Sequence, residues 1–89
     1  MLVTGKAEFR RVNDTYYFKD EKDREHAYNS MEIEDDYGRI TVTIPEDAME
    51  IAKKLERGKF YNFQLDLREY RGKKIKVYFI GIAWTMQGR

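Results

Sequence analysis

The sequence predicts an all-β fold with one helix, closed into a small barrel. Apolar and polar residues alternate with a period of two along most of the chain, which is typical of half-buried strands. Only residues 46–57 show the apolar spacing of a helix. The chain has 89 residues, enough for one modest core, and it contains no repeat and no flexible linker. We therefore expect a single domain over residues 1–89.

The first strand is predicted over residues 2–12, because the residues of one face are small or apolar. Those residues are Val3, Gly5, Ala7 and Phe9. Residues 13–14 have turn chemistry, and residues 15–19 (TYYFK) favour a short extra strand that continues the sheet. Residues 20–26 are all polar and are expected to form an exposed loop.

A hairpin follows, with strands at residues 28–34 and 39–44 and a tight turn at residues 35–38. The residues expected to face inward are Met31, Ile33, Ile40, Val42 and Ile44.

The helix is predicted over residues 46–57. Its apolar stripe consists of Ala48, Ile51, Ala52 and Leu55. Pro45 precedes it, acids occupy its first turn and bases its last, and Gly58 is placed to end it in a left-handed conformation.

Two long strands complete the chain, at residues 60–70 and 73–84. The first directs Tyr61, Phe63, Leu65 and Leu67 inward, and the second has Ile75, Val77, Phe79 and Ala83 on one face. Gly81 predicts a bulge or a bend. Ile80, Ile82 and Trp84 make the end of the other face apolar, so it needs a second covering. We expect a dimer or higher homo-oligomer with its contact there, and the alternative is coverage by a terminal segment of the chain.

Five main strands with the helix between strands 3 and 4 match the arrangement of an OB-like barrel. Residues 48–84, AMEIAKKLERGKFYNFQLDLREYRGKKIKVYFIGIAW, also resemble the C-terminal half of OB-fold single-stranded DNA-binding proteins of bacteria and their phages. The shared pattern is a helix A-x-x-I-A-x-x-L-x-x-G, an alternating strand, a charged aromatic loop and a last apolar strand. It covers about two-fifths of the chain.

The resemblance implies a binding protein and not an enzyme. The family's long extension with an acidic, phenylalanine-containing tail has no counterpart, since the sequence stops at TMQGR. We therefore expect a compact version of the phage or mobile-element type, used in replication or recombination.

The candidate ligand-binding residues are bases and tyrosines. In the family the connection REYRGKK, residues 68–74, touches the DNA strand, which implies phosphate contacts from Arg68, Arg71, Lys73 and Lys74 and base stacking on Tyr70. The alternative is a solvated hairpin tip. On the outer strand faces the candidates are Lys6, Arg10, Tyr17, Tyr28, Tyr37, Arg39 and Lys76, beside Asn62 and Gln64. Tyr28, Tyr37 and Arg39 are expected to form one cluster, and Tyr17 a stacking platform.

Net charge is only +1, yet the charges are segregated. Residues 14–36 carry nine acids and three bases, net −6, whereas residues 57–76 carry seven bases and two acids, net +5. The basic segment either forms a binding surface or pairs with the acidic one.

Other classes of site have little support. The chain has no cysteine, and Glu32, Glu34, Asp35 and Asp36 lack the spacing of a calcium loop. His26 and Ser30 lack the neighbours of a catalytic pair, and no phosphate-binding glycine motif is present. We expect no metal and no cofactor. No secretory signal or long apolar segment is visible, so a cytoplasmic location is expected, in the host if the gene is phage-encoded.

The sequence thus predicts binding of single-stranded DNA with little sequence preference, with RNA as a possible substitute. The alternative is a small barrel that binds another protein as an accessory factor or inhibitor.

Overall fold

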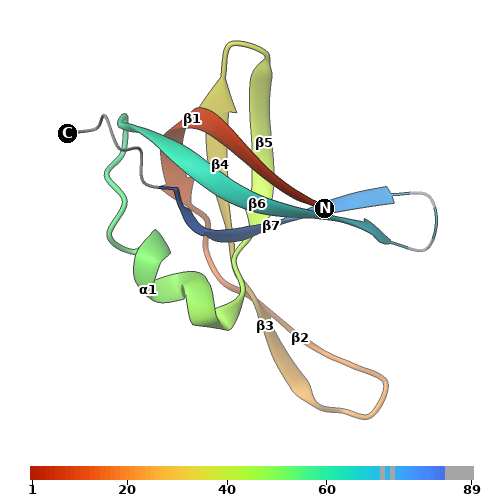
Figure 1. Cartoon of the computed structure of the whole chain (residues 1–89). Helices are drawn as coiled ribbons and strands as arrows, with labels where there is room; N and C mark the ends of the chain where they lie inside the picture. Colours follow the sequence, from red (N-terminus) through yellow and green to blue (C-terminus); the bar gives the residue numbers. More distant parts are fainter. Residues whose placement is uncertain (71, 73, 84–89) are drawn as a thin grey trace.

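The computed structural model describes residues 1–70, 72 and 74–83 (Figure 1). The strands are β1 (Leu2–Val12), β2 (Tyr16–Lys19), β3 (Glu25–Tyr28), β4 (Ser30–Asp35), β5 (Gly38–Thr43), β6 (Phe60–Tyr70) and β7 (Lys74–Ile82). A 3-10 turn, η1 (Glu46–Ala48), leads into the short helix α1 (Met49–Ala52). No helix in this described part of the chain is long and apolar enough to cross a membrane.

Five strands form a closed barrel in the order β1-β4-β5-β7-β6, and β6 pairs with β1 to close it. The ladders are antiparallel except for β5 and β7, which are parallel and pair at Thr43 and Tyr78. This confirms the predicted OB-like fold. The helix lies between β5 and β6, which are the third and fourth barrel strands in chain order.

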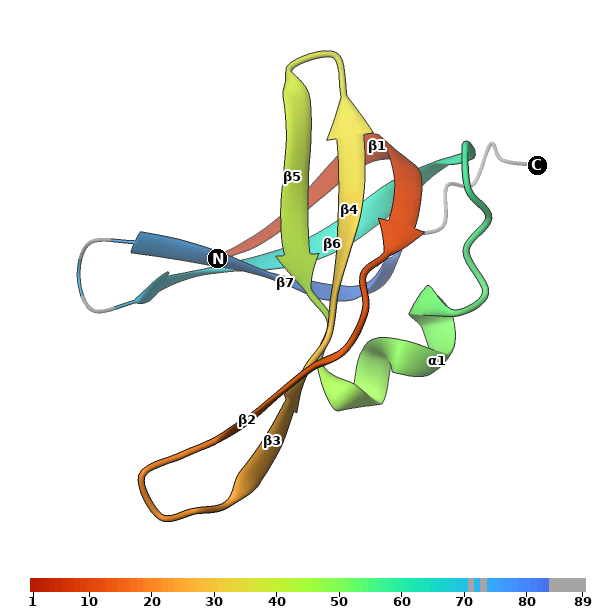
Figure 2. The ribbon, with the colours of Figure 1, turned by 180° about the vertical axis from the view of Figure 1, so that it is seen from behind.

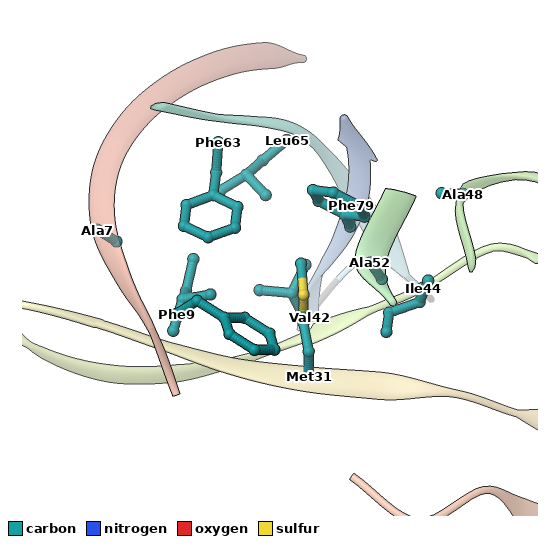
Figure 3. Close-up of a cluster of buried hydrophobic side chains, with 11 residues drawn as sticks. Ala7, Phe9, Met31, Val42, Ile44, Ala48, Ala52, Phe63, Leu65 and Phe79 are labelled. Atoms are coloured by element: carbon teal, nitrogen blue, oxygen red, sulfur yellow. The ribbon is translucent and has the colours of Figure 1, made fainter. Parts of the chain in front are cut away.

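The core forms where the inward faces of the strands meet (Figure 3). Phe63, Phe79, Met31 and Val42 are completely buried, as the period-two pattern predicts for strand residues of one face. Ala48 and Ala52 bring the helical segment against this core, because their small side chains allow close approach. Ile40, expected inside, is 46% exposed because it lines a cavity of about 100 Å³ that opens to the surface.

Residues 15–19 were predicted to continue the barrel sheet, and this prediction is wrong. Strands β2 and β3 pair only with each other and form a separate two-stranded arm. The expected loop at residues 20–26 is also shorter, because β3 begins at Glu25. In both views this β2–β3 arm and the β6–β7 hairpin project from the same side of the barrel, away from α1 (Figures 1 and 2).

The helix is shorter than its sequence pattern predicts. The N–H of Lys53 still bonds to the carbonyl of Met49, but the next bonds follow the tighter i to i−3 pattern. The chain is then drawn to β1, because the N–H of Gly58 donates to the carbonyl of Phe9 and the N–H of Phe9 donates to Lys59. Gly58 has a positive φ of +87°, as predicted, but it ends the loop and not the helix.

A bulge changes the faces of β7. The β6–β7 register shifts where Gln64 pairs with Gly81 and Leu65 with Phe79, so Ile80 is the extra residue. Ile82 consequently pairs with Phe63 and packs against the core, which corrects its predicted place on the outer face beside Ile80. Ile80 remains 42% exposed, and Trp84 lies outside the described residues.

Candidate nucleic-acid interface

The β2–β3 arm carries a row of aromatic rings on one face. Tyr16 pairs with Tyr28 and Phe18 with His26, so these four side chains share a side of the two-stranded ribbon. The rings of Tyr16 and Phe18 stack with centroids 5.9 Å apart, and those of Phe18 and His26 with centroids 5.2 Å apart. Tyr16 is 63% exposed and Phe18 42% exposed. The arm therefore offers aromatic surface that the barrel does not cover.

Asp20 organises the tip of this arm. Its carboxylate accepts the backbone N–H groups of Lys22 and Arg24, each at 2.9 Å, and the Nε of Arg24 at 3.1 Å. His26 donates from Nε2 to the same carboxylate at 2.8 Å. These bonds, with that of His26 as the largest contribution, lower the pKa of Asp20 to about 2. An ionised Asp20 thus fixes both the turn and the ring of His26 at the end of the aromatic row.

The roots of the two projecting hairpins meet on the outer face of the barrel. The Tyr28 hydroxyl lies 3.2 Å from the Thr43 hydroxyl, and Thr43 is the residue that pairs with Tyr78 of β7. The guanidinium of Arg68 lies over the Tyr78 ring, 5.3 Å from its centroid. Because Val42 and Phe79 point inward, their neighbours Thr43 and Tyr78 point outward, and a continuous surface runs from one hairpin to the other.

The β6–β7 hairpin supplies positive charge to this surface. Arg68 pairs with Lys76 across the ladder, and Lys74 follows on the same face; all three side chains are exposed. The Nε of Arg68 donates to Asp66 at 2.7 Å, and this bond is the main reason why the pKa of Asp66 is lowered. A cleft of about 400 Å³ lies at the base of the hairpin, between Arg68 and Tyr78 on one side and Asp47 on the other.

We call this region the inter-arm surface. Its residues are Tyr16, Phe18, His26, Tyr28, Thr43, Arg68, Lys74, Lys76 and Tyr78. Aromatic rings predominate on the β2–β3 arm and cations on the β6–β7 hairpin, so the surface combines groups that stack on bases with groups that meet phosphates.

The outer face of β1, β4 and β5 carries a compact cluster of ion pairs around two arginines. Arg39 contacts Glu32 at 3.3 Å and Glu34 at 3.0 Å, and these bonds raise the pKa of its guanidinium. Arg10 contacts Glu8 at 2.7 Å and Glu34 at 3.7 Å. Three carboxylates thus surround two guanidinium groups, a net charge of −1. A phosphate would have to displace these carboxylates to reach either arginine.

The predicted cluster of Tyr28, Tyr37 and Arg39 does not form. Tyr28 precedes the end of the β4–β5 hairpin where Ser30 pairs with Thr43, whereas Tyr37 lies in the turn at the opposite end. Tyr37 is 98% exposed and lines a separate cleft with Lys6, whose ammonium lies 6.0 Å from the centre of the Phe60 ring. Tyr28 and Tyr37 are close in sequence but lie at opposite ends of a hairpin with six residue pairs, so they cannot form one cluster.

Tyr17 lies in β2 but faces away from the aromatic row, because it alternates with Tyr16 and Phe18. Arg71 and Lys73 lie outside the described residues, and so does the side chain of Tyr70, whose backbone pairs with Lys74.

Five residues of the inter-arm surface escaped the sequence prediction: Tyr16, Phe18, His26, Thr43 and Tyr78. A signal for the first three was present, since residues 16 and 18 and residues 26 and 28 are aromatic with a period of two on both sides of a polar turn. Tyr78 likewise continues the period of Lys74 and Lys76.

Within the described residues, no group of three or more His, Asp or Glu side chains is arranged to hold a metal ion. No protein-family model, curated protein or solved structure matches the chain.

Proposed function

We propose that the protein binds single-stranded DNA, with little sequence preference, along the inter-arm surface. The observation that carries this proposal is the continuity from the aromatic row through Tyr28, Thr43 and Tyr78 to the cation Arg68. A strand following it would place bases against the rings of the β2–β3 arm and phosphates beside the β6–β7 hairpin.

The chemistry favours a single strand over a duplex. Bases within a duplex are stacked on each other, so they must leave the stack before they can lie on a side chain. Rings and cations that do not read hydrogen-bonding groups accept any base, since every base has a π-face. In OB-like barrels the connections corresponding to these two hairpins are also the ones that contact oligonucleotides.

The predicted resemblance to compact single-stranded DNA-binding proteins extends the proposal to a biological role. Such a protein would protect or present single strands during the replication or recombination of a phage or mobile element, in the cytoplasm of the host. RNA has the same phosphates and similar bases, with uracil in place of thymine, so the first experiment includes both a DNA and an RNA strand.

The experiment compares a fluorescent oligo-dT strand with a duplex and an oligo-U strand of the same length, at several salt concentrations. We expect oligo-dT to bind more tightly than the duplex, with an affinity that falls as salt rises because phosphate binding releases counterions. Equal or tighter binding of the duplex would contradict the proposal.

A protein-binding module remains the second candidate, and one observation favours it. Arg10 and Arg39, on the outer face of β1, β4 and β5, are held in ion pairs with carboxylates, which weakens their attraction for a polyanion. Under this alternative neither oligonucleotide binds at low salt.

A further inference from the structure

A groove lies between the end of helix α1 and the barrel strands beside it. It encloses about 410 Å³ and is lined by Ile51, Lys54, Leu55, Tyr61 and Ile82. Its lining is mostly apolar, and Ile51 leaves 40% of its surface exposed to solvent. The volume falls within the range of sites that hold a small ligand or bulky side chains of a partner.

The walls of the groove are held in place by the barrel. Leu55, Tyr61 and Ile82 pack against the buried core. The hydroxyl of Tyr61 accepts the backbone N–H of Glu56 at 2.9 Å, which fixes the ring and satisfies the amide at the end of the helical segment. The groove is therefore formed before a partner arrives, and binding need not order its walls.

Its one charged group is the ammonium of Lys54. Among the described residues Lys54 has no ion pair or side-chain hydrogen bond, whereas the nearby Glu56 is already paired with Lys59 at 3.2 Å. Residues 50–59, which supply Ile51, Lys54 and Leu55 to the lining, carry two acids and four bases, a net charge of +2. The segment that borders the groove is thus basic.

From this combination we infer that the groove binds an acidic peptide segment of a partner protein, with one bulky apolar side chain as its anchor. An anchor that fills the groove removes water from around Lys54. That desolvation is unfavourable unless the ligand brings a carboxylate to the ammonium. A neutral ligand leaves the charge without a partner, and a basic one repels it, so acids beside the anchor are required.

This site is distinct from the inter-arm surface. The groove shares no lining residue with the inter-arm surface, and the tips of both hairpins point away from α1 (Figures 1 and 2). A partner bound in the groove would leave the aromatic row and Arg68 accessible, so the protein could hold a nucleic acid and a second protein together.

The test uses a fluorescein-labelled peptide of five residues, a phenylalanine with two acids on each side, titrated with the full chain and followed by fluorescence anisotropy. We expect saturable binding that weakens at least about tenfold in Ile51→Ser and in Lys54→Glu, since each removes a central contact. Lys22→Glu is the charge control, since Lys22 is exposed between β2 and β3 and does not line the groove, and Leu2→Ser replaces an apolar residue that is 73% exposed elsewhere. Both controls should bind within about threefold of the parent, because neither position lies in the groove or in the segment beside it.

Two further peptides test the chemistry. A serine in place of the phenylalanine should abolish binding, and lysines in place of the acids should do the same. Oligo-dT binding should be unchanged in Ile51→Ser, which separates this site from the proposed nucleic-acid function. Circular dichroism melting confirms that each variant is folded.

The inference would be overturned if the parent protein failed to bind the acidic peptide, if the groove variants bound it like the parent, or if the lysine peptide bound equally well. Conversion of a dimer to a monomer by Ile51→Ser in light scattering would assign the groove to a second copy. A red shift of Trp84 emission in Ile51→Ser without peptide would assign it to the chain's own end.

Discussion

Replacing Phe18 by alanine should weaken the binding of oligo-dT and leave the folding stability of the barrel nearly unchanged. Phe18 is the middle ring of the aromatic row, 5.9 Å from Tyr16 and 5.2 Å from His26. Loss of one base-stacking ring typically costs about 1–3 kcal/mol of binding free energy. Since about 1.4 kcal/mol is tenfold, the Kd for oligo-dT should rise about 5- to 150-fold.

The same change should leave the barrel intact. Each ring contact of Phe18 stabilises the arm by about 0.5–1.5 kcal/mol at most, and the arm pairs only with itself. Local opening of an arm does not unfold a core to which it contributes nothing. The thermal midpoint of the barrel should therefore move by no more than a few degrees.

The assay is fluorescence anisotropy with labelled oligo-dT, and Tyr17→Ala is the matched control. Tyr17 is 66% exposed in the same strand but faces away from the aromatic row. If Phe18→Ala binds like the parent, or if Tyr17→Ala loses as much affinity, the arm does not bind bases through this face.

Lys74→Ala should reduce the slope of log affinity against log salt by about 0.7, the value for one phosphate contact on a single strand, as measured in oligo-dT titrations; an unchanged slope would remove Lys74 from the phosphate path. Met31→Ala should lower the free energy of unfolding by about 2–5 kcal/mol in urea, because Met31 is fully buried and leaves a cavity; a smaller loss would mean that the core collapses around it. The folded pKa of Asp20 is depressed to about 2 from 3.8, so its contribution to the arm is present above pH 3.8 and is lost as pH falls through 2; amide shifts of Lys22 and Arg24 that titrate near 3.8 would contradict this. Ile80 is 42% exposed, and if it lies at an oligomer contact, light scattering should show an assembly that Ile80→Ser dissociates; a monomeric parent at high micromolar concentration would exclude that contact.

The sequence allowed the barrel to be predicted because its strands obey one rule. Residues such as Phe63 and Val42 alternate with polar neighbours, and burying one face of each strand leaves few arrangements other than a closed barrel. The sequence of residues 46–57 has the apolar spacing and end residues of a helix, yet α1 ends at Ala52. The backbone of Phe9 takes the hydrogen bonds at Gly58 and Lys59, and this tertiary pairing outweighs helix propensity.

The candidate site was harder to predict, for two physical reasons. A single bulge at Ile80 turns Ile82 from the outer face to the core, and alternation alone cannot show which residue is the extra one. Arg10 and Arg39 were predicted to bind a ligand, whereas Glu8 of the same strand pairs with Arg10, and Glu34, opposite in the β4–β5 hairpin, pairs with Arg39. Alternation shows which face a side chain is on, but not which ion pairs it forms. The REYRGKK connection remains a prediction, since Arg71 and Lys73 lie outside the described residues.

The most direct test of the central claim is an NMR titration of the isotopically labelled protein with oligo-dT. The inter-arm surface predicts that amide shifts concentrate in residues 16–28 and 66–78 and extend through Thr43. The ion-paired face around Glu32 and Arg39 should change little. Shifts centred on that face, with the two hairpins unaffected, would contradict the account.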